Sequence, residues 1–166
     1  MIPTVETDRL RLRDWRLSDF EAYVTLRTSE ELQRYTAGGA VSSEKAWEGF
    51  CAARGEWAFR GAGVFLVAER DSDDAIGFAG LWHPPYVDEP ELCWSLFPGN
   101  TGKGYATEAA AAARDWAYRD LGLPPLMSFI HPKNTLSHAV AKRLGATVEA
   151  ETTLHGEPRI VYRHPK

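Results

Sequence analysis

The chain has 166 residues, of which 44% are hydrophobic, and these values fit one domain with an ordinary core. We therefore expect a single domain over residues 1–166. The formal net charge of −4 argues against general binding to nucleic acid or to an anionic membrane, and it mildly favours a cationic amine as a ligand.

No segment has the pattern of a targeting or membrane-spanning sequence. The N-terminus lacks the basic start and apolar core of a signal peptide, and no apolar run approaches the roughly 18 residues that span a bilayer. The two cysteines, Cys51 and Cys93, show neither metal-ligand spacing nor a disulfide framework. We expect a cytoplasmic protein with no metal, no nucleic-acid partner and no membrane contact.

The first half of the chain mixes strand and helix signals. Apolar and charged residues alternate over 9–13, which is typical of a half-buried strand. Serines precede two apolar-periodic stretches and favour helix starts there, and an apolar run follows the second. We expect a strand over 9–13, a helix capped by Ser18, a break at 38–39, a helix from Ser43 and a strand over 64–68.

The second half continues in mixed order. An acidic turn at 71–74 separates the apolar run from a glycine-containing strand, and an alanine-rich helix stops at Gly122. The expected elements are strands over 75–82 and 91–96, a helix over 105–121, a strand over 126–130, a helix from Asn134 to Gly145, and a terminal hairpin of 147–154 and 159–163. Mixed order predicts a mixed α/β fold, with a twisted mixed sheet flanked by helices.

A glycine-rich loop between a strand and the alanine-rich helix is the main clue to function. Gly102 and Gly104 let backbone N–H groups turn toward one point, where the helix beginning near Tyr105 adds the positive end of its dipole. A phosphate or pyrophosphate suits such a loop. A Walker loop needs a hydroxyl residue after Lys103, where Gly104 stands, and a Rossmann fingerprint needs glycine where Thr107 stands.

The remaining phosphate-binding interpretation is a family resemblance. Residues 99–104, Gly-Asn-Thr-Gly-Lys-Gly, resemble the Gln/Arg-x-x-Gly-x-Gly/Ala signature of the GNAT acetyltransferases, and residues 104–109, Gly-Tyr-Ala-Thr-Glu-Ala, are similar to the version in their RimJ/RimL-like branch. Gly99 departs from the signature, so a side-chain contact made there by many relatives would be absent, while the backbone cradle could remain.

Two further segments support the resemblance. Residues 131–146 resemble the Asn-x-x-Ser/Ala…Leu-Gly-Phe element of the family, although Asn134 and Gly145 would also serve simply as helix caps. The opening Glu-Thr-Asp-Arg-Leu-Arg-Leu-Arg over 6–13 is similar as well, so the resemblance runs from about Glu6 to Arg163. It implies a GNAT fold and acetyl-CoA as cosubstrate. The implied contacts are Trp94, Ser95, Leu96, Gly99, Asn100, Thr101, Gly102, Lys103, Gly104, Tyr105, Ala106, Thr107, Asn134 and Ser137.

Acetyl transfer from a thioester to an amine has definite chemical needs. The amine must lose a proton, and the thioester oxygen gains charge that backbone N–H groups of residues 93–97 could stabilise. The resemblance of residues 91–94 to the family's Glu-Ile-Gly-Tyr strand makes Glu91 the leading base, with Glu89, His83, His155 and Glu151 as substitutes. We expect Cys93 to be a buried strand residue and not a nucleophile.

Protonation of the departing thiolate is assigned to Ser137. The resemblance places this residue near the thioester sulfur, whereas Ala141 stands where many members of the family have a proton-donating tyrosine. Water, or no protein group at all, is the alternative.

The expected function is therefore an acetyl-CoA-dependent N-acetyltransferase. Its acceptor is a primary amine, a small molecule or a protein N-terminus, which attacks directly through a tetrahedral intermediate. Residues 35–40 and 83–89 are expected to border the acceptor site. A catalytically degenerate CoA-binding sensor or partner-binding module is the alternative, and a monomer or homodimer is expected.

Overall fold

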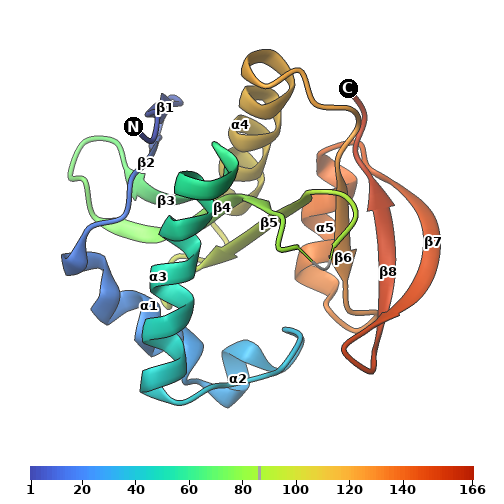
Figure 1. Cartoon of the computed structure of the whole chain (residues 1–166), viewed down its shortest axis with the longest axis horizontal. Helices are drawn as coiled ribbons and strands as arrows, with labels where there is room; N and C mark the ends of the chain where they lie inside the picture. The colour runs from blue at the N-terminus through green and yellow to red at the C-terminus, as the bar shows by residue number, and fades with distance from the viewer. Residues whose placement is uncertain (86) are drawn as a thin grey trace.

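One mixed sheet of eight strands organises the computed structural model, which describes residues 1–85 and 87–166 (Figure 1). The strand order is β1-β2-β3-β4-β5-β6-β8-β7, and the pairings are antiparallel except between β5 and β6. The expected mixed α/β class is confirmed. The strands are Val5–Glu6 (β1), Leu10–Arg13 (β2), Val64–Glu69 (β3), Ala75–Trp82 (β4), Glu91–Leu96 (β5), Met127–Ile130 (β6), Thr147–Leu154 (β7) and Glu157–Arg163 (β8).

The helices mostly follow the expected boundaries. They are η1 (Leu17–Asp19, a 3-10 turn), α1 (Phe20–Arg27), α2 (Glu30–Gln33), α3 (Ser43–Arg60), α4 (Tyr105–Asp120) and α5 (Thr135–Arg143). The expectation that Ser18 caps the first helix is wrong. A 3-10 turn, η1, precedes α1, so Ser18 lies inside η1 and not before α1. The Asp19 carboxylate accepts the Arg16 N–H at 2.7 Å. The short α2 and β1 were not expected from the sequence.

The two faces of the sheet carry separate cores. Successive strand residues point to opposite faces, so Leu66 packs with α1 and α3 while Phe65 packs with α4. In Figure 1, α1 and α3 lie on the left of β5, whereas β6, β7, β8 and α5 lie on its right. Gly77 permits the close approach of β4 and β5, since a Cβ there would lie 2.3 Å from the Ser95 carbonyl oxygen. β5 is thus the central strand between two halves of the molecule. One half contains β1 to β4 with α1 and α3, and the other contains β6 to β8 with α5.

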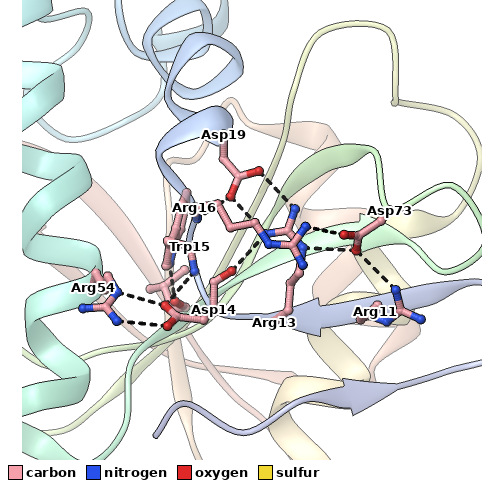
Figure 2. A network of polar contacts seen from close by, with 9 residues as sticks. Arg11, Arg13, Asp14, Trp15, Arg16, Asp19, Arg54 and Asp73 are labelled. Atoms are coloured by element: carbon pink, nitrogen blue, oxygen red, sulfur yellow. Dashed lines mark hydrogen bonds and ion pairs between the residues drawn. The ribbon is translucent and has the colours of Figure 1, made fainter.

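Charged residues fix β2 to its neighbours (Figure 2). Arg13 was expected at a solvated position of a half-buried strand, yet it is 5% exposed and forms a bidentate pair with Asp19 at 3.0 Å. Asp73, in the β3–β4 turn, accepts from Arg11, Arg13 and Arg16. These arginines outweigh the desolvation of Asp73 and lower its pKa. The network joins β2, η1 and the β3–β4 hairpin.

The parallel strands β5 and β6 separate almost as soon as they meet. Their register contains one pair, Glu91 with Met127. Just beyond it, the Ser128 hydroxyl donates to the Leu92 carbonyl at 2.5 Å and lies 2.9 Å from His164 Nε2. His164 is fully buried, and this burial, helped by Arg114 and Arg163, lowers its pKa to about 4. A neutral imidazole therefore joins the halves where the strands diverge. Within the described ranges, none of the helices has the length and apolar character required to cross a bilayer.

Candidate active site

A cleft opens where β5 and β6 diverge. Its volume is about 830 Å³, and residues of both halves line it. Because the two strands separate here, their facing edges carry backbone groups without ladder partners. The walls come from the segment after α1, from β5, from the end of β6, from the start of α5 and from the β7–β8 hairpin.

The backbone of β5 presents alternate N–H groups to the cleft. The Phe97 N–H is occupied, because it donates to the Ile76 carbonyl of β4 at 2.9 Å. Backbone N–H groups alternate in direction along a strand, so those of Trp94 and Leu96 face the open edge. Trp94, Ser95 and Leu96, three of the expected cosubstrate contacts, line the cleft. Of the backbone N–H groups of residues 93–97 that were expected to donate to the oxyanion, those of Trp94 and Leu96 face the cleft, whereas that of Phe97 is already bonded.

Glu91 lines the cleft, and the pKa of its carboxyl group is strongly shifted. Its Oε1 accepts the N–H of Phe129 on β6 at 3.2 Å, so the carboxyl group replaces the backbone carbonyl that a paired strand would offer to this N–H. Burial raises the pKa of Glu91 to about 7, although the Phe129 N–H and the charge of Arg159 act in the opposite direction. A carboxyl with this pKa can accept a proton near neutral pH.

Of the four substitute bases, Glu89, His83 and Glu151 are less well placed than Glu91. Glu89 is paired with Arg163 at 2.6 Å on the surface, and His155 lines the cleft. His83 and Glu151 are absent from the residues that line it. Cys93 does line the cleft, but burial and the nearby Glu91 raise the pKa of its thiol, so the nucleophilic thiolate is suppressed.

The start of α5 brings two predicted residues to the cleft. Asn134 caps the helix by accepting the Ser137 N–H at 3.2 Å through Oδ1, which leaves its amide NH₂ as a donor for a ligand. Both interpretations of Asn134, a helix cap and a ligand contact, are thus compatible. Ser137 also lines the cleft, whereas Ala141 is fully buried against Ile130 and Tyr162.

The glycine-rich loop continues from the cleft to the start of α4. Gly99, Gly102 and Gly104 all have φ between 80° and 84°, a conformation that favours glycine. Gly104 is the residue before α4, whose first amides lack intrahelical partners. Thr101 and Ala106 line the cleft, whereas Gly99, Asn100, Gly102, Lys103, Gly104, Tyr105 and Thr107 lie beyond its lining.

Side chains around the loop have structural partners. Asn100 Nδ2 donates to the Phe97 and Pro98 carbonyls at 3.3 Å, and the Tyr105 hydroxyl donates to Glu69 at 2.8 Å. Any contact from Tyr105 to a phosphate would therefore come from its backbone. Lys103 Nζ lies 5.7 Å from the centre of the Tyr105 ring.

A polar clamp that sequence reasoning missed holds this loop. Glu108, in the first turn of α4, accepts from Thr7 Oγ1 at 2.6 Å and from Arg9 Nε at 2.8 Å. Arg9 Nη1 also donates to the Lys103 carbonyl at 3.0 Å. The opening motif and the loop motif are thus physically joined, although about a hundred positions of sequence separate them. Their resemblance signals were visible separately, but not their contact.

Two further residues that line the cleft, His131 and Arg159, had no expected role. Tyr35, in the expected acceptor border, stacks on His131 with ring centroids 5.2 Å apart, which brings the two halves into contact across the cleft. Arg159 of β8 also lines the cleft. Val87 represents the other expected border, and Tyr86 lies outside the described residues.

Comparison with known proteins supports the same assignment. The Acetyltransferase (GNAT) domain family matches residues 9–147. YnaD of Bacillus subtilis (strain 168), an uncharacterized N-acetyltransferase, is 26% identical over 141 residues, which are 85% of this chain and 81% of YnaD. A crystal structure of an acetyltransferase from Agrobacterium tumefaciens str. C58 is 38% identical, with a TM-score of 0.91 and coverage of 100% of this chain and 96% of that one.

A third comparison extends the likeness of the fold to the RimJ/RimL-like branch. Mycobacterium smegmatis RimJ, in complex with CoA-disulfide, is 17% identical with a TM-score of 0.77, over 98% of this chain and 85% of that chain. The family match covers most of the chain and agrees with the cleft and loop described above. The chain therefore belongs to the GNAT family of acetyltransferases.

Proposed function

We propose that this protein transfers the acetyl group of acetyl-CoA to a primary amine, either of a small molecule or of a protein N-terminus. The observation that carries the proposal is the Glu91 carboxyl, which lies in the cleft beside the unpaired edge of β5 with its pKa raised to about 7. An amine acceptor needs such a base, because amines are mostly protonated at neutral pH. The reaction is expected in the cytoplasm, with the protein as a monomer or homodimer.

The residues of the cleft have distinct roles in this proposal. Glu91 takes a proton from the amine, directly or through water, and the amine nitrogen bonds to the thioester carbon to give a tetrahedral intermediate. The C–S bond breaks when this intermediate collapses. The Trp94 N–H, with that of Leu96, donates to the thioester oxygen as it gains negative charge. Ser137 gives a proton to the departing thiolate sulfur.

The chain offers groups suited to the pyrophosphate and to the pantetheine arm of CoA. Backbone amides of the 99–104 loop and of the α4 N-terminus suit the pyrophosphate, and the Asn134 amide suits the pantetheine arm. The RimJ structure with which this chain shares its fold contains CoA as a disulfide. All the cofactor contacts expected from the sequence, at residues 94–96, 99–107, 134 and 137, belong to this proposal.

The test compares two glutamates that lie two residues apart. Glu91→Gln keeps an acceptor for the Phe129 N–H but removes the base, and we expect kcat to fall by about 100-fold or more with CoA binding retained. Glu89→Gln tests the neighbouring substitute base, and we expect kcat near the wild-type value because Glu89 is held in a surface pair with Arg163. Release of CoA during amine acetylation measures kcat, and calorimetry measures CoA binding. Equal activity of Glu91→Gln and wild type would contradict the assigned base.

Ser137 is tested separately. Ser137→Ala should lower kcat if its hydroxyl protonates the thiolate. Folded, CoA-binding protein that acetylates no amine would instead support the degenerate CoA-binding module.

A further inference from the structure

Arg159 is a buried cation on the acceptor side of the cleft. It is 3% exposed, yet it lines the cleft together with Glu91. Successive side chains of β8 point to opposite faces of the sheet, and Ile160 and Tyr162 pack on the face that carries Ala141 of α5. Arg159 therefore points to the opposite face of the sheet. On β5 the same alternation separates Cys93, which packs beside the α1 and α3 core, from Trp94, which packs beside α4 and α5.

Among the described residues, Arg159 forms no ion pair, although its charge acts on the carboxyl group of Glu91. Among the described residues its hydrogen bond is from Nη1 to the Pro158 carbonyl at 2.8 Å, and no carboxylate of these residues lies within ion-pair distance. The other strongly buried arginine, Arg13, has a bidentate aspartate at 3.0 Å. Burial of an unpaired charge is costly. A guanidinium left in this state beside a binding cleft is suited to an anion that arrives with the ligand.

We propose that Arg159 binds a carboxylate of the acceptor, so that the acceptor is a small amino acid whose amine is directed to Glu91. This inference rests on the proposed function. The cleft would match the two charges of a zwitterion, with the carboxylate at Arg159 and the ammonium at Glu91. An amine at a protein N-terminus lacks this adjacent carboxylate, because its carboxyl group is part of a peptide bond.

Binding of the carboxylate has a consequence for the base. The charge of Arg159 lowers the pKa of Glu91. Neutralisation of that charge by the acceptor would raise the pKa, and Glu91 would then become a stronger base when the acceptor is in place. Substrate recognition and proton removal would be coupled through this pair of residues.

Matched pairs of acceptors test the proposal. Each of the common amino acids is assayed beside its own carboxamide, which keeps the amine and side chain but removes the negative charge. CoA release gives kcat and KM, and mass spectrometry identifies the product. For the accepted side chain, we expect kcat/KM for the amino acid to exceed that of its amide by about 10- to 100-fold, the range for a hydrogen bond to a charged group.

Variants of Arg159 locate the effect. Arg159→Gln should raise KM for the amino acid by a similar factor and bring the acid-to-amide ratio close to one, whereas Arg159→Lys should restore part of the ratio. Arg119→Gln is the control, since Arg119 is 68% exposed on α4 and paired with Asp120. CoA binding measured on each variant establishes that the fold is retained. If Arg159→Gln fails to fold, the wild-type ratio and Arg159→Lys decide the question.

The outcomes separate this inference from the proposed function. Acetylation of amines with no preference for the carboxylate, or an unchanged ratio in Arg159→Gln, would overturn the inference and leave the N-acetyltransferase proposal intact. A protein that binds CoA but acetylates no member of the panel and no peptide N-terminus would overturn both.

Discussion

At the scale of single residues, Glu91 would combine its proposed role as a base with a cost in stability. Its side chain contacts the Phe129 N–H at the end of the β5–β6 pairing, where burial raises its pKa from 4.5 to about 7. The ionised carboxylate that accepts a proton is the form that burial disfavours. Sequence resemblance identified the position, but the raised pKa arises from burial in the folded chain, against which Phe129 and Arg159, both distant in sequence, act.

The pH dependence of Glu91 gives a prediction with opposite signs for activity and stability. Because a folded-state pKa above the unfolded value means that the folded chain holds the proton longer, stability falls as pH rises from about 4.5 to 7. Glu91→Gln should therefore be more stable than wild type at pH 8, by about 2 to 3 kcal/mol, and nearly equal at pH 4.5. Urea unfolding at both values measures this difference.

Wild-type activity should follow the same group. We expect kcat/KM to decrease below pH 7 as Glu91 becomes protonated. A Glu91→Gln variant that is less stable than wild type at pH 8 would show that the carboxyl is not held in the disfavoured ionised state.

At the scale of elements, the glycine-rich loop depends on the N-terminal segment. Thr7 and Arg9 bond to Glu108, and Arg9 also bonds to the Lys103 carbonyl, so the segment before β2 fixes both the loop and the first turn of α4. These contacts outweigh the desolvation of Glu108 and lower its pKa. The glycine positions and the helix start were predictable from local backbone preferences, whereas the clamp needed the fold.

The clamp predicts a defect in cosubstrate binding. Glu108→Gln weakens the bonds to Arg9, and loss of about 1 kcal/mol would raise the Kd for CoA roughly fivefold. Glu48→Gln is a matched control on α3, where Glu48 is 61% exposed and paired with Lys45. Calorimetric titration with CoA compares the two variants. An unchanged Kd in Glu108→Gln would mean that the loop keeps its shape without the clamp.

At the scale of the whole molecule, a small polar junction joins the halves on either side of the cleft. Ser128 donates to Leu92 of β5, and His164 contacts Ser128 from the segment after β8. A single register pair accompanies this junction. The protonation state of one buried histidine is therefore coupled to the stability of the entire chain.

The junction predicts loss of stability in acid. The pKa of His164 is lowered from 6.5 to about 4, so the folded chain resists protonation and stability decreases as pH falls from 6.5 toward 4. In His164→Gln, the difference in unfolding free energy between pH 7.5 and pH 4.5 should be smaller than in wild type by about 2 to 3 kcal/mol. His83→Gln makes the same substitution elsewhere and should retain the wild-type difference. Equal differences in all three proteins would exclude this role of His164.

The sequence alone determined the features that depend on neighbouring residues. Local sequence patterns placed β3, β5 and α4, Ser43 and Asn134 marked helix starts, and glycines marked the loop, whereas the side chain that caps α3 is that of Ser42. The motifs were sufficient to indicate the family. Only the tertiary structure decided the divergence of β5 and β6, the pKa of Glu91, the Glu108 clamp and the burial of Arg159. Local signals reflect backbone preferences within a few residues, whereas burial and charge depend on segments that only folding brings together.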